Sequence, residues 1–181
     1  VDVGRDLAGS GARVVVVPDL GAPPDTLLDT LAPTIERLDR WNVPVVIDPI
    51  LEPIGHGLMA SLERYVQVRR RYPDAEMLMG IGNLTELTAA DSTGVNAVLV
   101  AICQELGVRT VLTTEVAPWA RGAVREVDLA RRLMHYAVTR RTLPKGIDDR
   151  LLTVRDAAVL AFTEAELREL QASLTDPNFR I

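Results

Sequence analysis

The stretch VIDPILEP, from Val46 to Pro53, places a carboxylate and a proline directly after a run of apolar residues. The run reads as a buried strand, because an apolar segment without polar alternation is typical of a strand that is covered on both faces. Pro49 ends the strand, since proline cannot donate to the hydrogen-bond ladder of a sheet. Asp48 therefore carries its charge to the point where a strand of the core stops.

Three further runs have the same character, and each is followed by apolar residues at helical spacing. The strand starts lie about 30 residues apart, which is typical of successive βα units and predicts an α/β protein with a parallel sheet. The segment before the first strand, Val1 to Gly11, reads as the end of an earlier helix. The predicted strands are Val14–Val17, Val43–Ile47, Met77–Ile81 and Thr110–Leu112, and the predicted helices are Leu27–Leu38, Leu58–Val68, about Asp91–Gly107, and Val124–Val138 with both of these valines on its inner face.

A polar residue follows the carboxyl end of each predicted strand: Asp19, Asp48, Asn83 and Glu115. An open dinucleotide-binding sheet would need a glycine-rich turn after its first strand, and Pro18 to Pro24 does not supply GxGxxG. In a closed barrel these strand ends converge on one mouth, where several side chains reach a single ligand. The pattern therefore favours the (β/α)8 TIM-barrel fold.

The chain is too short for a complete barrel, which takes roughly 250 residues. Its 181 residues provide only about the last four βα units. Residues 1–156 are predicted to form the C-terminal half of such a barrel, and residues 157–181 a C-terminal helical tail. A half barrel leaves open sheet edges and a bare apolar face. We therefore expect it to pair with the missing half of a barrel or to form a homodimer.

The composition is that of an ordinary globular protein, with 48% hydrophobic and 25% charged residues. A formal net charge of -5 offers no excess of positive charge for phosphate backbones, so no nucleic-acid partner is expected. The single cysteine, Cys103, cannot form an internal disulfide and fits a reducing cytoplasm. No apolar run approaches the ~18 residues that a membrane span requires, so no membrane partner is expected either.

Asp48 and Asn83 are the main candidates for ligand binding. A carboxylate at a strand end needs hydrogen-bond donors, and a heterocycle with adjacent ring N–H and amino groups would satisfy both oxygens of Asp48. The alternative is that Asp48 caps the loop that follows. Asn83 offers a donor and an acceptor next to two glycines that would let a flat ligand approach the backbone. Glu115, and Asn96 one turn into a helix, are secondary candidates.

The remaining chemistry-bearing residues receive structural interpretations. His56 stands in a glycine-rich turn, and His135 is expected to pack partly buried on its helix. Two histidines and one cysteine that lie far apart in sequence give no zinc pattern, so no metal site is predicted. Cys103 is expected in the core. The basic run Arg69–Arg71 is expected to be the solvated end of a helix.

Four motifs in this sequence resemble a known family. They read VIDPILEPIGHG, MGIGNLTELTAADSTGVN, VLTTEV and LARRLMHYAVTRRTLPKGIDDRLLTVRD, and they span nearly all of positions 43 to 156. They are similar to the dihydropteroate-synthase-related proteins of archaea and methylotrophic bacteria. The resemblance implies the pterin-binding barrel fold, a reduced pterin as substrate or cofactor, and Asp48 as the residue that holds the pterin edge.

Two branches of this superfamily use the pocket differently. True dihydropteroate synthases carry Ser-Arg-Lys and Arg-x-His after the seventh and eighth strands, where this sequence has Gly82-Asn83-Leu84 and Leu112-Thr113-Thr114. Corrinoid-dependent methyltetrahydrofolate methyltransferases carry Gly-Leu-Ser-Asn and a second Asn, which Gly80 to Asn83 and Asn96 resemble. In that branch the resemblance implies a catalytic Asn83, which hydrogen-bonds near the reactive pterin nitrogen as charge develops there.

The resemblance thus implies a pterin-binding, dihydropteroate-synthase-like transferase of folate or tetrahydromethanopterin metabolism, with Mg²⁺ as a cofactor if it acts as a synthase. The missing cationic residues leave two alternatives open: a corrinoid-linked methyltetrahydropterin methyltransferase, or a non-catalytic pterin-binding subunit. In every case Asp48 and Asn83 are expected to bind the pterin, with Glu115 and Asn96 as further contacts.

Overall fold

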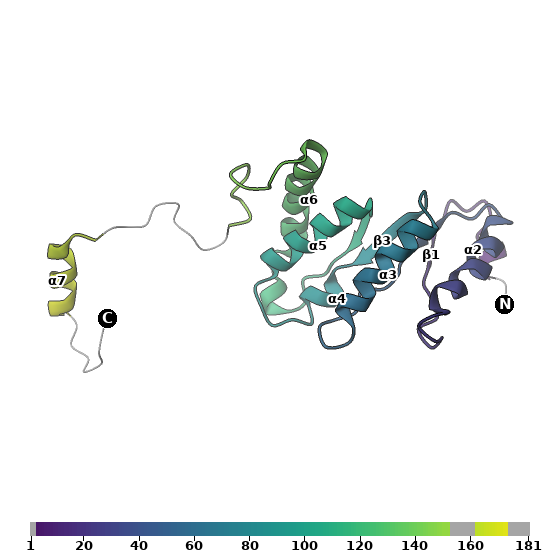
Figure 1. Cartoon of the computed structure of the whole chain (residues 1–181), viewed down its shortest axis with the longest axis horizontal. Helices are drawn as coiled ribbons and strands as arrows, with labels where there is room; N and C mark the ends of the chain where they lie inside the picture. The colour runs from purple at the N-terminus through teal and green to yellow at the C-terminus, as the bar shows by residue number, and fades with distance from the viewer. Residues whose placement is uncertain (1–2, 153–161, 174–181) are drawn as a thin grey trace. The chain divides into compact units, whose positions relative to one another are not determined.

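A computed structural model describes residues 3–152 and 162–173 of the chain. The chain divides into two units, Val1–Leu151 and Leu152–Ile181, and the predicted boundary between residues 156 and 157 lies outside the described residues. The first unit holds a parallel sheet with helices between its strands (Figure 1). In the second unit the described part contains a helix, α7 (Glu164–Ser173), within the segment that was predicted to be a helical tail.

The sheet contains four parallel strands in the order β1-β2-β3-β4. The register places Val16 beside Ile47, and Ile47 beside Met77. The predicted α/β class and parallel sheet are therefore confirmed, with small shifts at the strand ends. The strands are β1 (Val14–Val16), β2 (Val45–Ile47), β3 (Glu76–Gly80) and β4 (Thr110–Leu112).

The long helices follow the predicted apolar spacing. α5 ends at Gly107, whose φ of +67° is a left-handed conformation that glycine adopts without strain. The short elements α4 and η2 were not predicted, because a single turn carries no periodicity. The helices of the first unit are α1 (Val3–Asp6), η1 (Leu27–Thr30), α2 (Leu31–Asp39), α3 (Leu58–Arg71), α4 (Gly82–Thr85), α5 (Ser92–Leu106), η2 (Pro118–Ala120) and α6 (Ala123–Arg140).

The connecting helices cover one face of the sheet, because consecutive strands are neighbours and parallel crossovers are right-handed. Figure 1 shows α2, α3, α5 and α6 following one another across the first unit in chain order. The core lies under these helices, where Val16, Ile47, Met77 and Met79 are at most 4% exposed. Cys103 lies in this core as predicted, and burial raises the pKa of its thiol to about 12.

The opposite face of the sheet is open at the two edge strands. Val15 of β1 is 48% exposed and Leu112 of β4 is 60% exposed, whereas Val46 of β2 on the same face is buried. Strand residues alternate between the two faces of a sheet, and the helices cover one of them. The prediction that every strand is covered on both faces is therefore wrong for β1 and β4.

Three expectations about α6 are also wrong. Val124 and Val138 are 55% and 39% exposed, because α6 buries a narrower stripe that includes Val127 and Ala130. His135 is exposed instead of partly buried, and its Nδ1 lies 3.2 Å from the side-chain oxygen of a glutamine on α5. The helix thus presents more of its surface to solvent than its apolar spacing predicts.

Arg69 corrects the prediction of a solvated basic run. Its guanidinium donates to the carbonyls of Leu106 and Gly107 at the end of α5, over 2.8 and 3.2 Å. It also donates to the carbonyls of Pro73 and Ala75 between α3 and β3, over 2.7 and 2.9 Å. This one side chain therefore joins α3, the loop that leads to β3, and the end of α5.

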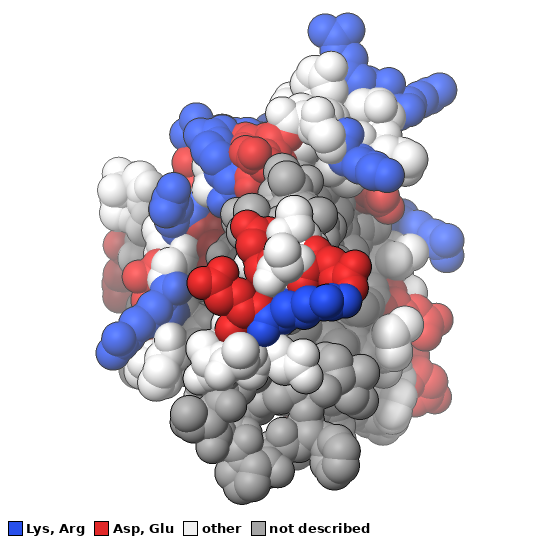
Figure 2. All heavy atoms as spheres, turned by 90° about the vertical axis from the view of Figure 1, so that its left-hand side faces the viewer, with Lys and Arg blue, Asp and Glu red and all other residues white. Residues whose placement is uncertain are grey.

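Figure 2 shows both acidic and basic side chains among the described residues. The mixture matches the composition of the chain, which has 25 acidic and 20 basic residues. Among the described helices, none is both long enough and apolar enough to cross a membrane.

Candidate functional site

Asp48 follows β2, and its carboxylate is held on one side. Oδ1 accepts the hydroxyl of Tyr65 at 2.9 Å and the backbone N–H of Ile50 at 2.8 Å. Burial raises the pKa of Asp48 above its usual value, while these two hydrogen bonds and the charge of Arg64 oppose that rise. A carboxylate oxygen has two lone pairs, so Oδ1 is filled. No described residue donates to Oδ2. A ligand can therefore bind Oδ2 alone, whereas both oxygens were expected to bind it.

The backbone after Asp48 is strained and is fixed by an arginine. Ile50 has a φ of +66°, a left-handed conformation that a β-branched residue adopts at a cost of about 1–3 kcal/mol. Arg64 of α3 donates from Nε to the carbonyl of Pro49 at 2.6 Å and from Nη2 to the carbonyl of Ile50 at 2.7 Å. The turn is therefore preformed, which is common where a backbone must hold a ligand-binding side chain in place.

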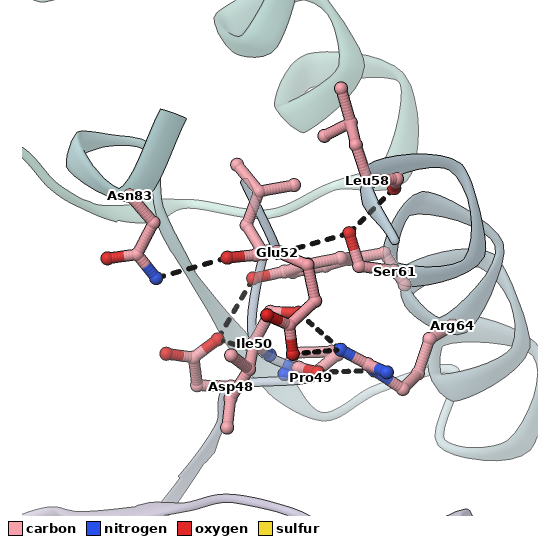
Figure 3. Close-up of polar contacts among 10 residues, drawn as sticks. Asp48, Pro49, Ile50, Glu52, Leu58, Ser61, Arg64 and Asn83 are labelled. Carbon is pink, nitrogen blue, oxygen red and sulfur yellow. Dashed lines mark hydrogen bonds and ion pairs between the residues drawn. The ribbon is translucent and has the colours of Figure 1, made fainter. Parts of the chain in front are cut away.

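Asn83 lies in α4, directly after β3. Its Nδ2 donates to the carbonyl of Leu51 at 3.1 Å, so the end of β3 is bonded to the loop that follows β2. Its side chain is exposed, and no described residue donates to Oδ1. Figure 3 shows Oδ1 of Asn83 and the outer oxygen of Asp48 directed to the same side. Two open acceptors therefore follow the neighbouring strands β2 and β3 at the carboxyl edge of the sheet.

A pocket of about 220 Å³ lies beside Asn83, between the ends of β3 and β4. Glu86 on its wall accepts the hydroxyl of Thr114 at 2.6 Å and the N–H groups of Val116 and Ala117 at 2.9 and 2.6 Å. These hydrogen bonds lower the pKa of Glu86. Glu86 was not predicted as a site residue, although its position one helical turn after Asn83 could have identified it. The lining residues are Gly80, Gly82, Asn83, Glu86, Leu87, Leu112, Thr113 and Thr114.

The two secondary candidates have partners inside the fold. Glu115 accepts the N–H of Val124 in the first turn of α6 at 2.9 Å. Asn96 is fully buried on α5 and donates from Nδ2 to Glu126 of α6 at 2.8 Å, while its Oδ1 has no partner among the described residues. The structure therefore places Asp48 and Asn83 after neighbouring strands, with Asn83 bonded to the loop that follows Asp48, and it gives Glu115 and Asn96 contacts that join α6 to its neighbours.

The capping contact of Glu115 can be separated from the predicted substrate contact. Glu115→Ala is expected to lower the free energy of unfolding by about 1 kcal/mol, because a helix N–H loses its acceptor. Glu115→Gln keeps an acceptor oxygen and is expected to lose less. Urea unfolding measures both. If Glu115 also contacts the ligand, both variants lose ligand affinity; if it serves only the helix, the affinity of both is unchanged.

Two further polar candidates are exposed side chains in turns. Asp19 is exposed, and its Oδ1 accepts the N–H of Gly21 at 2.9 Å within its own turn. His56 is exposed in the turn before α3. The described residues bring no group of three or more His, Cys, Asp or Glu side chains together that could hold a metal ion.

No family model matches the chain. The chain is 33% identical over 159 residues to an uncharacterized protein of Methanocaldococcus jannaschii, MJ0107. The match covers 83% of this chain and 30% of that protein. The chain therefore spans about a third of the length of this archaeal relative.

Proposed function

We propose that the chain binds the ring edge of a reduced pterin at the ends of β2 and β3, as part of a dihydropteroate-synthase-like protein. The observation that carries this proposal is the pair of open acceptors, Oδ2 of Asp48 and Oδ1 of Asn83, on one side of the sheet edge (Figure 3). A pterin carries adjacent ring N–H and amino donors. Because Oδ1 of Asp48 is filled, the two donors are shared between Asp48 and Asn83.

The strand order supports a barrel as the complete fold. An open doubly wound sheet reverses its strand order at the ligand site, whereas β1-β2-β3-β4 runs in one direction and places its helices on one face. The apolar side chains of Val15 and Leu112 on the other face would then turn toward the barrel interior. Further βα units are the partner that this face and the two open edges require, supplied by a longer chain or by a second copy.

The pocket beside Asn83 favours methyl transfer, which releases no anionic group such as pyrophosphate. Among the described residues that line it, Glu86 is the charged one, and Lys, Arg and His are absent. A departing pyrophosphate is stabilised by cations, so this lining suits a synthase poorly. It favours a methyltransferase that uses a methylated pterin and a corrinoid partner, in which Asn83 hydrogen-bonds near the reactive ring nitrogen. It is also compatible with a pterin-binding subunit without its own chemistry.

Titration calorimetry of the protein with tetrahydrofolate and with a hydroxymethyl dihydropterin tests the proposal. Binding of either is expected, and Asn83→Ala is expected to weaken it about tenfold, because one of the two open acceptors is lost. Asn42→Gly is the control. It removes an exposed amide at a φ of +51° that glycine adopts without strain, and affinity should not change.

The reaction is tested on the same protein. A change in the cobalt–carbon absorption of a supplied methylcorrinoid in the presence of tetrahydrofolate supports methyl transfer, whereas pyrophosphate release with p-aminobenzoate supports the synthase. Binding without either reaction leaves the non-catalytic subunit. If neither pterin binds, the proposed function is wrong.

A further inference from the structure

Tyr65 of α3 hydrogen-bonds to Asp48 of the candidate site. Its side chain on α3 has no exposed surface, and its hydroxyl lies 2.9 Å from Oδ1 of Asp48. Tyr72 at the end of the same helix offers a contrast, because its buried hydroxyl has no partner among the described residues. The bond from Tyr65 to Asp48 is therefore a specific link between a helix and a strand end, and not a general consequence of burying a tyrosine.

This bond decides how Asp48 meets a ligand. The hydroxyl of Tyr65 and the N–H of Ile50 fill Oδ1 and so fix the rotation of the carboxylate. Oδ2 is then presented on the side where Asn83 also points its open oxygen (Figure 3). Without the hydroxyl, the carboxylate would keep a single hydrogen bond from the backbone and would be free to turn about it.

We propose that Tyr65 is a positioning residue, which orients Asp48 so that Oδ2 can accept an N–H of the ligand. The proposal rests on the proposed pterin-binding function and deepens it, because it assigns the control of the key acceptor to a residue that does not touch the ligand. Within the described part of the chain, Tyr65 is the only side chain that hydrogen-bonds to Asp48.

The other groups around the pair do not replace this bond. Arg64 is the nearby cation, and its guanidinium is committed to the carbonyls of Pro49 and Ile50, with Glu52 at 3.7 Å. On α5, Cys103 is a neutral thiol because burial raises its pKa to about 12. The ionisable and polar groups near Asp48 are therefore Arg64 with its partner Glu52, the neutral thiol of Cys103 and the neutral amide of Asn83.

Loss of the hydroxyl has a defined effect on protonation. The bond from Tyr65 is among the interactions that lower the pKa of Asp48 against the effect of burial, so its removal raises that pKa further. Binding requires an ionised acceptor. When the Tyr65 hydroxyl is absent, acidification should therefore abolish ligand binding at a higher pH than it does in the wild type.

The test compares Tyr65→Phe with Tyr72→Phe, which delete the same atom from the same helix. Tyr65→Phe is expected to bind tetrahydrofolate about tenfold more weakly at neutral pH, and to lose binding at a higher pH than the wild type. Tyr72→Phe is expected to bind like the wild type at every pH. Carbon-detected NMR titration of the Asp48 carboxyl gives a second measurement without ligand, and circular dichroism verifies that both variants are folded.

The outcomes separate this proposal from the proposed function. If the wild type binds no reduced pterin, the proposed function fails, and the NMR titration still decides whether Tyr65 controls the ionisation of Asp48. If Tyr65→Phe binds as tightly as Tyr72→Phe, the positioning role is wrong, even where the pKa of Asp48 has risen. A uniform loss of affinity in both variants would also overturn it, because it would trace the effect to the packing of α3.

Discussion

Asp48→Asn is expected to weaken pterin binding by about a hundredfold or more, equal to about 2.7 kcal/mol, while the folded protein becomes no less stable. The asparagine oxygen can keep the hydrogen bonds from Tyr65 and the N–H of Ile50, because these two donors require an acceptor at Oδ1. The amide nitrogen must then occupy the outer position. It presents a donor to the donor groups of the ligand, so binding is lost without loss of the turn.

The effect on stability has a definite sign. Burial raises the pKa of Asp48, so the folded state holds the proton more tightly than the unfolded chain does. Ionisation of Asp48 at neutral pH therefore lowers stability. As the pH falls from above the pKa of Asp48 in the folded state toward its pKa in the unfolded state, the wild type should become more stable. Asp48→Asn has no group that titrates here, so it should not show this gain. Urea unfolding at neutral and mildly acidic pH measures the difference.

Asp19→Asn provides the matched control. Asp19 also follows a strand, and its Oδ1 also accepts a backbone N–H two residues later, at 2.9 Å from Gly21. The side chain is exposed and makes no bond to a tyrosine in the described structure. Pterin affinity of this variant should equal that of the wild type. If Asp48→Asn binds tetrahydrofolate as tightly as Asp19→Asn does, Asp48 is not the acceptor.

The sequence predicted the order of strands and helices well, because apolar spacing records which residues must be buried. It could not tell which strands form the edges of the sheet, since Val15 and Leu112 are as apolar as the buried Ile47. That distinction depends on what lies beside each strand. The same limit explains why Val124 was wrongly placed inside, because spacing fixes the direction of the apolar stripe and not its width.

The candidate site was predicted in part for a similar reason. Asp48 and Asn83 follow buried strands, and the parallel sheet brings such positions to one edge. Tyr65 and Arg64 lie 17 and 16 residues after Asp48, and no local pattern marks them as its neighbours. The left-handed backbone of Ile50 could not be predicted either, since neither glycine nor asparagine occupies that position. These residues became identifiable only once α3 was packed against the end of β2.

Arg69→Ala is expected to lower the free energy of unfolding by roughly 3 kcal/mol, the largest stability effect that we predict outside the core. Arg69 donates to carbonyls at the end of α5 and in the loop between α3 and β3. Its planar group presents five donors in a wide fork, whereas the three donors of a lysine ammonium radiate from a single nitrogen and cannot span acceptors on both segments equally well. Arg69→Lys should therefore recover only a part of the loss.

Arg71→Ala is the control, because Arg71 lies on the same helix and makes an ion pair with exposed Asp29. Exposed ion pairs contribute about 0.5 kcal/mol, so this variant should unfold near the wild-type midpoint in urea. Hydrogen exchange locates the effect. In Arg69→Ala the amides at the start of β3 and the end of α5 should exchange faster together, since one side chain joins them. Equal destabilisation by Arg69→Ala and Arg71→Ala would show that these arginines act through their charge. The hydrogen bonds of Arg69 to the α5 end and the α3–β3 loop would then make no specific contribution to stability.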